Sequence, residues 1–467
     1  MLDTQTIVQR FLETKLQVHP DVVRYLSEQD DPGLLERVIA SVPGDTVVVS
    51  AKHIPGIVPE KDGARFLTDP SVEVINGIAG STGRILGSED YLPYFRDRYH
   101  RLGGMIRSRC SPMPIEALAR SSRYRQEECT ILGMVMEVRS TQNGHRMIDL
   151  EDPTGSIRVL FLKDRPVFAD AERILPDEVI GARGTLSGDG KVLFADLLYR
   201  PDIPMSHAPF MSSEPGRAVL ISDVHVGSNT FLEEAWNRFG NWLDEREEIS
   251  YLLIAGDLVD GIGVYPGQDQ ELAIKNIYEQ YARAGELMSG LPSRIRIVIS
   301  PGNHDVVRGA EPQPAIPPQF TANFPGNVTF VENPALVNLQ GVRILMYHGR
   351  SIDDMISLIP GASYDNPAPL LDGMLQRRHL APTYGKRTPI AADRQDRLVI
   401  DPIPEVLHTG HIHIVGLTRY RGIIGVNSGT WQSQTAFQRQ MNVNPTPAEA
   451  VVLDLQTLNP EIVSFLE

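Results

Sequence analysis

Five short groups of Asp, Asn, Gly and His residues each stand directly behind an apolar run in the second half of the chain. In order, they are Asp223-Val224-His225, Gly256-Asp257-Leu258-Val259-Asp260, Gly302-Asn303-His304-Asp305, His348-Gly349 and Gly410-His411-Ile412-His413. The apolar runs predict strands, and helices are predicted near 231–247 and 272–288. Strands of an α/β sheet expose their carboxyl ends to one crevice, so we expect the five groups to meet there. The pattern predicts a layered α/β domain over residues 216–467.

The residue types in these groups are ligands for divalent cations. Two cations about 3.5–4 Å apart can activate the water that attacks a phosphodiester and stabilise the departing oxygen. Asp-x-His and His-x-His place alternate side chains on one side of an extended segment, so both can hold one cation. Glycines before Asp257, Asn303 and His411 allow tight turns after the strands. The sequence therefore predicts phosphoester hydrolysis at a site for two cations.

The order of the five groups resembles that of the calcineurin-like metallophosphoesterase superfamily. The resemblance implies two ligand sets that share Asp257 as a bridge. One set is Asp223, His225, Asp257 and His413, and the other is Asp257, Asn303, His348 and His411. It also implies that His304 is the acid that protonates or stabilises the leaving oxygen, and that Asp260 is the carboxylate that orients His304. Manganese is the expected metal, and iron and zinc also suit these ligands.

A small β-barrel is predicted upstream of this domain. Five short strands alternate with turn signals such as Asn143-Gly144 and Gly188-Asp189-Gly190, and a helix is expected over 167–174. The predicted strands are Ile131–Val138, Arg146–Glu151, Ile157–Leu162, Val179–Leu186 and Val192–Tyr199. This order is typical of an OB-like barrel. The strands carry few aromatic residues, which favours contact with protein over the stacking of bases.

The remaining chain divides by composition. Helical spacing predicts a small helical unit over residues 1–42, followed by a linker of uncertain structure over 43–88 with some strand content. A basic helix and the barrel occupy 89–205, and prolines mark the connection to the last domain. The expected fold class is therefore multidomain α+β, with a helical unit, an OB-like barrel and a layered metallophosphoesterase domain.

Residues 96–125 are basic, with eight arginines against two acids. Two interpretations stay open: these arginines contact phosphates, or the helix docks by an apolar face and leaves them in water. A second basic group could line the path of DNA to the site, and comprises Arg377, Arg378, Lys386 and Arg387. The neighbouring His379 could touch a phosphate or lie on a solvated basic face. His408 lies inside an apolar run and is expected to be a core residue.

Net charge and cysteine content add constraints. A formal charge of −15 disfavours binding of phosphate backbones by the bulk surface, so sustained contact with DNA is expected to need a partner. Bound cations would reverse the local field at the site. Two cysteines suit a reducing cytoplasm, where we expect this protein. No signal peptide or membrane span is predicted.

The order of an OB-like barrel followed directly by a metallophosphoesterase domain is similar to that in the small subunits of replicative DNA polymerases. Residues 84–467 resemble the small subunits of archaeal family D polymerases in several short motifs. Those motifs are Phe95-Arg96-Asp97-Arg98-Tyr99, Ile148-Asp149-Leu150-Glu151-Asp152-Pro153-Thr154-Gly155, Arg200-Pro201-Asp202-Ile203-Pro204, Tyr347-His348-Gly349-Arg350-Ser351 and Arg378-His379-Leu380-Ala381-Pro382. The resemblance implies a proofreading 3′–5′ exonuclease in a heterodimer with a large catalytic subunit, acting on DNA 3′ ends. The alternatives are a non-catalytic assembly subunit, and a stand-alone repair nuclease or phosphatase.

Overall fold

A computed structural model describes residues 4–14, 16–18, 20–28, 33–42, 48–49, 70–75, 87–120, 128–440 and 443–466. The chain forms two compact units, residues 1–65 and 66–467. No helix in these described ranges is both long and apolar enough to span a membrane.

The first unit is built on three helices, as the spacing of apolar residues predicts. They are α1 (Thr4–Glu13), α2 (Pro20–Glu28) and α3 (Leu34–Ser41). Their apolar faces meet in a small core that includes Ile7, Phe11 and Leu26. A parallel pair of two-residue strands, β1 (Gln17–Val18) and β2 (Val48–Val49), accompanies them. The first was not expected, and the second lies in the segment where some strand content was predicted.

All five predicted barrel strands form, and they close in the order β4-β5-β6-β8-β7. Their bounds are β4 (Glu128–Ser140), β5 (Arg146–Asp152), β6 (Gly155–Phe161), β7 (Val179–Leu186) and β8 (Val192–Tyr199). Alternate residues such as Ile148 and Leu150 fill the interior, as period-two patterning requires. The short helix α6 (Phe168–Ala171) lies inside the predicted helical range, and α5 (Ile115–Arg120) contacts β6.

Two six-stranded sheets make up the rest of the second unit. The first sheet has the order β12-β11-β10-β9-β18-β19, and the second has the order β16-β17-β15-β14-β13-β3. The first contains β9 (Arg217–Ile221), β10 (Ile249–Ala255), β11 (Arg296–Ser300), β12 (Val328–Phe330), β18 (Glu449–Asp454) and β19 (Pro460–Ser464). The second contains β3 (Val72–Val74), β13 (Ala335–Leu339), β14 (Val342–Met346), β15 (Val406–Thr409), β16 (Gly416–Tyr420) and β17 (Ile423–Asn427).

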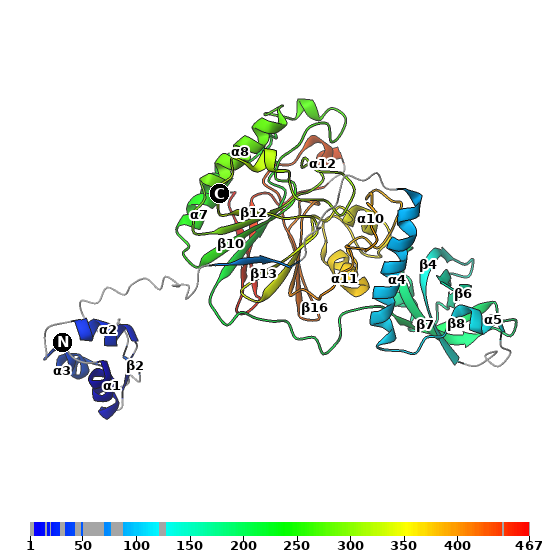
Figure 1. Ribbon diagram of the computed structural model, residues 1–467, viewed down its shortest axis with the longest axis horizontal. Coiled ribbons are helices and arrows are strands. Elements are labelled where there is room, and N and C mark those ends of the chain that lie inside the picture. The colour runs from blue at the N-terminus through cyan, green and yellow to red at the C-terminus, as the bar shows by residue number, and fades with distance from the viewer. Residues whose placement is uncertain are drawn as a thin grey trace. The chain divides into compact units, whose positions relative to one another are not determined.

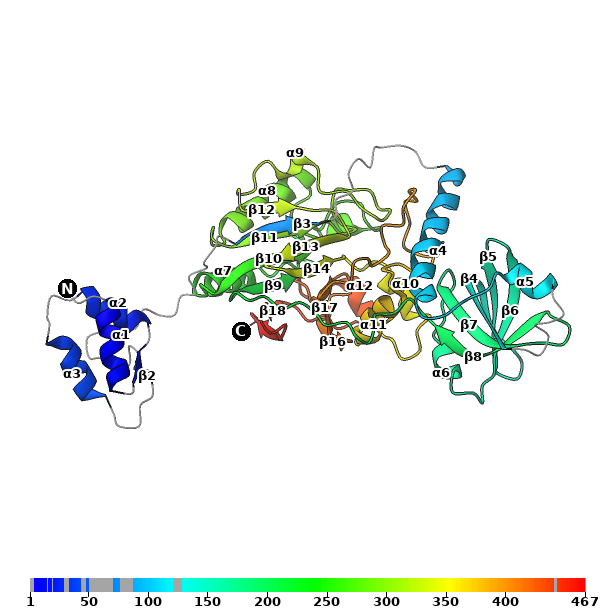
Figure 2. The ribbon, with the colours of Figure 1, turned by 60° about the horizontal axis from the view of Figure 1, so that its bottom comes forward.

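The sheets stack face to face and helices cover their outer faces (Figures 1 and 2). Buried side chains of both sheets, including Leu253 and Ile344, form the core between them. On the outer face of the first sheet lie α7 (Glu233–Asp244) and α8 (Ile277–Ser289), and beside the second lie α10 (Ile352–Ile356) and α11 (Ala368–Arg377). Short helices α9 (Pro318–Thr321) and α12 (Ala436–Gln440) lie in loops. This is a layered α/β arrangement, as predicted.

The described part of the expected linker holds a strand of the second sheet. Val72–Val74 form β3, which pairs antiparallel with β13 at the sheet edge. Short β-branched runs in this segment indicate strand content, but a partner so far along the chain leaves no local signal. The remainder of 43–69 and 76–86, apart from β2, lies outside the described residues.

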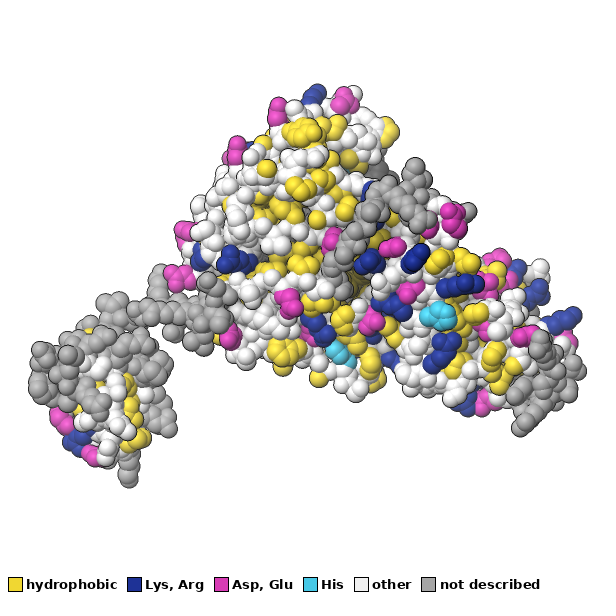
Figure 3. Space-filling view, in the orientation of Figure 1, with side chains coloured by type: hydrophobic (Ala, Val, Ile, Leu, Met, Phe, Trp, Pro, Cys, Tyr) yellow, Lys and Arg dark blue, Asp and Glu magenta, His cyan; other side chains and the backbone are white. Residues whose placement is uncertain are grey.

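The basic segment begins with α4 (Tyr91–Arg107), which follows a single 3-10 turn at Ser88–Asp90. Tyr94, Leu102 and Ile106 are buried, so the helix docks by its apolar face. Arg96, Arg107 and Arg109 remain exposed, and Lys and Arg side chains gather around this helix (Figure 3). Docking by the apolar face is therefore confirmed for the described residues, the exposed arginines stay compatible with phosphate contact, and Arg98 is an exception to both interpretations.

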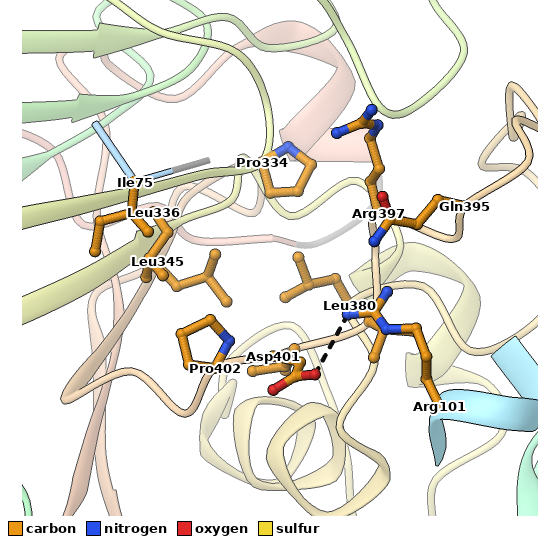
Figure 4. Close-up of a pocket in the computed structure, with 12 residues that line it drawn as sticks. Ile75, Arg101, Pro334, Leu336, Leu345, Leu380, Gln395, Arg397, Asp401 and Pro402 are labelled. Carbon is orange, nitrogen blue, oxygen red and sulfur yellow. Dashed lines mark ion pairs between the residues drawn. The ribbon is translucent and has the colours of Figure 1, made fainter. Parts of the chain in front are cut away.

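Arg98 lies in the interior instead of in water. Its Nε donates to Asp396 at 2.7 Å, and its Nη1 donates to the carbonyl of Pro382 at 2.8 Å. The side chain is only 1% exposed, which an arginine tolerates when an acid and carbonyls compensate its charge. A cavity of about 200 Å³ lies between α4 and the second sheet, and a 3.7 Å ion pair between Arg101 and Asp401 forms part of its wall (Figure 4).

Candidate metal centre

The five sequence groups meet in space. Three of them follow β9, β10 and β11 of the first sheet, and two follow β14 and β15 of the second. Carboxylate and imidazole atoms from both sheets approach within 4.8 Å in three overlapping groups. These groups are Asp223, His225 and His413; His225, Asp257 and His304; and Asp257, His348 and His411. The expected convergence at one edge of the layered domain is therefore observed.

Backbone strain is concentrated at these residues. Five of the expected ligands have left-handed φ angles between 51° and 74°. They are Asp223, His225, Asp257, His411 and His413. A non-glycine residue in this region costs about 1–3 kcal/mol and persists only where the surrounding structure enforces it. Such strain clusters at functional sites, and here it turns successive side chains toward one centre.

Two glycines let the backbone approach the carboxylates closely. A Cβ at Gly302 would lie 2.2 Å from Oδ1 of Asp257, and a Cβ at Gly410 would lie 2.4 Å from Oδ2 of Asp223. Any side chain at either position would displace a carboxylate. Glycine is therefore required at 302 and 410 because a Cβ atom would collide with these oxygens. Neither residue has a positive φ angle.

The first ligand group surrounds Asp223. Oδ1 of Asp223 lies 3.3 Å from Nε2 of His413 and 3.8 Å from Nε2 of His225. Its Oδ2 accepts hydrogen bonds from the Ser222 hydroxyl and from the backbone N–H of His411, the latter at 2.9 Å. The three side chains thus present one oxygen and two nitrogens to a common point.

The second group surrounds His348. Its Nδ1 donates to the carbonyl of Ala255 at 3.0 Å, which leaves Nε2 facing the centre. That Nε2 lies 3.1 Å from Oδ1 of Asn303 and 3.2 Å from Oδ2 of Asp257. The ring of His411 packs edge-on against that of His348, with centroids 5.2 Å apart. All four expected members of this ligand set therefore lie together.

Asp257 lies between the two groups. Its Oδ2 is 3.2 Å from Nε2 of His348 and 3.9 Å from Nε2 of His225, while Oδ1 accepts the backbone N–H of His304 at 2.8 Å. Burial alone would raise the pKa of Asp257, but the charges of His348 and His304 hold it well below its ordinary value. The shared position is the one expected of a bridging carboxylate.

The donor set fits divalent cations. Oδ1 of Asp223 is buried and has no hydrogen-bond partner. Nε2 of His225 and Nε2 of His413 face each other at 3.1 Å. An unsatisfied carboxylate oxygen and two converging imidazole nitrogens are costly in a buried site without a cation. Mixed oxygen and nitrogen donors of this kind suit manganese, iron or zinc.

His304 stands beside both groups without belonging to either expected ligand set. Its Nδ1 lies 2.7 Å from the backbone carbonyl of Asp260, so this nitrogen carries the proton and Nε2 is left for a reacting group. Burial lowers the pKa of His304, and the charge of Asp257 opposes this effect. A neutral imidazole held through its Nδ1 is suited to moving a proton at Nε2.

The expectation that the carboxylate of Asp260 orients His304 is wrong. Oδ1 of Asp260 lies 3.0 Å from Nδ1 of His225, and Oδ2 accepts from Nε2 of Gln268 at 3.1 Å. The carboxylate therefore orients a predicted cation ligand, and only the main chain of Asp260 holds His304. Together with Asp223 it raises the pKa of His225 to about 10, although burial acts in the opposite direction.

Two acids that sequence reasoning left without a role support the site. Asp353 of α10 has Oδ2 3.2 Å from Nε2 of His411. Asp305 accepts the backbone N–H groups of Gly302 at 2.9 Å and Leu258 at 3.2 Å, which ties two ligand loops together. Burial raises the pKa of Asp305 to about 6. Asp305 was visible as the last residue of its motif, whereas Asp353 carries no motif of its own.

Two members of the second basic group are not available to DNA. Arg377 is buried and its Nε lies 3.1 Å from Oε2 of Glu178, and Arg378 is buried with its Nε donating to the carbonyl of Ile400 at 2.7 Å. His379 is also buried, 2.8 Å from Oδ2 of Asp396, so neither interpretation offered for it holds. Arginine-rich sequence usually indicates a surface, but these side chains join α11 to distant acids. Lys386 and Arg387 are exposed.

His408 is a core residue, as expected. It is fully buried in β15, and its Nε2 lies 2.7 Å from the hydroxyl of Ser428. Burial lowers its pKa to about 3. The ring is therefore neutral and takes no part in the metal centre.

Two protein-family models match parts of this chain. The family model for the B subunits of DNA polymerases alpha and epsilon matches residues 218–413, which contain the site. The model for the OB-fold nucleic acid binding domain matches residues 129–196, which form the barrel. A solved archaeal phosphodiesterase covers 53% of this chain and 98% of its own, at 9% identity and a TM-score of 0.28, which is too low to inform on fold.

Relatives that match most of the chain show the family to which it belongs. The DNA polymerase II small subunit of Halobacterium salinarum is 38% identical, covering 95% of this chain and 96% of that protein. The one of Thermoplasma acidophilum is 37% identical over 99% and 93%. The one of Archaeoglobus fulgidus is 44% identical over 82% and 78%. The chain belongs to the family of archaeal DNA polymerase II small subunits.

Proposed function

We propose that this chain is a metal-dependent 3′–5′ exodeoxyribonuclease that trims mispaired 3′ ends. In this proposal it acts as the small subunit of a family D polymerase, in a heterodimer with a large catalytic subunit. The observation that carries the activity is the convergence of the full ligand set around Asp257, including an unpartnered buried oxygen on Asp223. A subunit with only an assembly role has no use for such a cluster.

The proposed site holds two divalent cations, with manganese expected. Asp223, His225, Asp257 and His413 hold one, and Asp257, Asn303, His348 and His411 hold the other. Bound there, the cations supply Lewis-acid activation of water and neutralise charge on the phosphate. They also provide positive charge in a chain whose formal charge is −15.

The protein's own residues orient the expected cation ligands and move a proton. Asp260 fixes the ring of His225 through Nδ1, and the Ala255 carbonyl fixes His348 in the same way, so both rings present Nε2. His304 is held by the Asp260 carbonyl with Nε2 free to interact with the departing 3′ oxygen. An approaching phosphate stabilises the protonated ring, which can then donate that proton to the leaving oxygen.

The test is trimming of 3′-mismatched primer-templates in manganese by the purified chain, alone and with the large subunit. Asp257→Asn and His304→Ala remove the bridge and the proton carrier, and Arg217→Gln is the control at the opposite end of β9. We expect trimming by the wild type and the control only. No trimming in either form would overturn the proposal, and trimming that survives both active-site substitutions would indicate a contaminant. Phosphatase activity without DNA cleavage would favour a different enzyme of the superfamily.

A further inference from the structure

A surface loop after α11 is connected to the metal centre by two consecutive acids of α10. Asp353 contacts Nε2 of His411 through Oδ2 at 3.2 Å. Asp354 accepts the backbone N–H groups of Arg387 at 2.8 Å and Thr388 at 3.0 Å. One turn of α10 therefore fixes both a predicted cation ligand and the loop that carries Lys386 and Arg387.

The side chain of Arg387 is exposed and lies close to this contact. The hydroxyl of Tyr364 donates to Oδ1 of Asp353 at 2.9 Å. Burial raises the pKa of Tyr364 to about 12, and the nearby Arg387 guanidinium acts in the opposite direction. Arg387 forms no ion pair with a carboxylate within the described part of the chain. Its charge lowers the pKa of Asp353, and the exposed guanidinium can add a phosphate contact next to the metal centre.

One aromatic ring, that of Tyr384, stands on the same loop. Tyr384 is 37% exposed, and its ring centroid lies 5.2 Å from that of Tyr91 and 5.3 Å from that of Phe95, both in α4. Its backbone N–H donates to Oδ2 of Asp177 in the barrel at 2.8 Å. Contacts with α4 and with the barrel thus hold the ring in place while part of it remains open to solvent.

We propose that Tyr384 and Arg387 form a binding site for an unpaired strand of DNA beside the metal centre. Arg387 binds a backbone phosphate, and Tyr384 stacks on a base. This inference rests on the proposed nuclease function and adds to it the residues that bind the substrate. Basic side chains that follow the phosphate backbone, combined with aromatic rings on which bases stack, are the usual basis of single-strand binding. Paired bases are stacked on each other, so such a ring selects a frayed end over a duplex end.

The experiment measures binding of a fluorescent oligothymidylate to the full chain at low salt in EDTA, which prevents cleavage. We expect Arg387→Gln to weaken binding about five- to tenfold and to reduce the slope of log K against log salt by about 0.7, the value for one phosphate contact on a single strand. Tyr384→Leu keeps an apolar contact with α4, and we expect it to weaken binding about tenfold without changing that slope. An abasic oligonucleotide should not respond to Tyr384→Leu.

A second readout separates binding from chemistry. In manganese, both variants should raise KM for trimming of the same oligonucleotide and leave kcat unchanged. Arg217→Gln, at a half-buried arginine at the far end of β9, should change neither quantity. Arg387→Lys should keep most of the salt slope that Arg387→Gln loses, because the phosphate contact requires charge more than shape.

The outcomes distinguish this inference from the proposed function. If the wild type trims DNA while both variants match it in Kd, salt slope and KM, the binding site is wrong and the nuclease stands. If the wild type neither binds nor trims, both proposals fail. If the variants bind the oligonucleotide normally but lose the large subunit in a co-purification, the surface is a protein interface and the inference is overturned.

Discussion

Oδ1 of Asp260 lies 3.0 Å from Nδ1 of His225, while the ring of His304 is held by the backbone carbonyl of the same residue at 2.7 Å. One residue thus serves a cation ligand with its side chain and a proton carrier with its main chain. Substitutions at Asp260 can therefore affect the first function without removing the second.

Asp260→Ala should weaken cation binding by about 10- to 100-fold, because His225 loses the partner that fixes its tautomer and orientation. Asp260→Asn retains a polar partner for His225 and should lose less cation affinity. Titration of manganese into the chain, followed by calorimetry, measures both. Equal affinities for Asp260→Ala and the wild type would show that the contact does not orient His225.

His304→Ala should leave manganese affinity within about threefold of the wild type and reduce kcat for trimming by about 10²–10⁴, the usual contribution of a general acid. The reason is that Nε2 of His304 is free and its Nδ1 is bound by a carbonyl. A loss of manganese affinity as large as that of Asp257→Asn would instead identify His304 as a ligand.

Cation binding should release protons at neutral pH. In the metal-free chain, carboxylates raise the pKa of His225 and of His348 to about 10, against the effect of burial, so both rings are protonated at pH 7. A ligating imidazole must be neutral, so affinity should rise as pH rises toward 10. Calorimetry in buffers of different ionisation enthalpy counts the protons. A binding enthalpy independent of the buffer would contradict this expectation.

Glu178→Gln should lower the free energy of unfolding by about 3–5 kcal/mol. Glu178 is buried between two arginines, with Oε1 2.6 Å from Nε of Arg200 and Oε2 3.1 Å from Nε of Arg377. The substitution leaves their charges uncompensated. Arg183→Gln breaks the exposed pair with Glu128 in the same barrel and should leave the free energy of unfolding nearly unchanged. Chemical denaturation of the three proteins provides the comparison.

His379 should make stability dependent on pH. Burial and the charge of Arg98 lower its pKa to about 4, below the ordinary value of about 6.5 in the unfolded chain. The unfolded state therefore binds the proton first, and stability present above pH 6.5 is lost as pH falls to 4. From this group the loss is about 3 kcal/mol. His379→Gln keeps a donor to Asp396, and its free energy of unfolding, measured by urea denaturation, should fall less steeply between these pH values.

Local pattern predicted much of this molecule. The barrel strands show period-two alternation between turn signals, and β7 and β8 begin and end at the predicted residues. The ligand groups were visible because each follows an apolar strand, and strands of one layer place their ends together. Such features depend on neighbours in sequence, which a single chain displays directly.

Contacts between distant segments could not be predicted in the same way. Arg377 resembles a surface residue until Glu178, 199 positions away, compensates its charge. Asp353 reaches His411 from a short helix without any motif, and β3 joins the second sheet through β13. The carboxylate of Asp260 also had two histidines within reach, and only their positions in space decide between them.

The left-handed backbone at five of the expected ligands has an evolutionary consequence. Substitution to glycine at Asp223, His225 or Asp257 would relieve about 1 kcal/mol or more of strain at each position. Loss of these side chains would therefore be stabilising wherever the ligands were not needed. The five residues keep this conformation at a cost in stability, which is the pattern of a functional site.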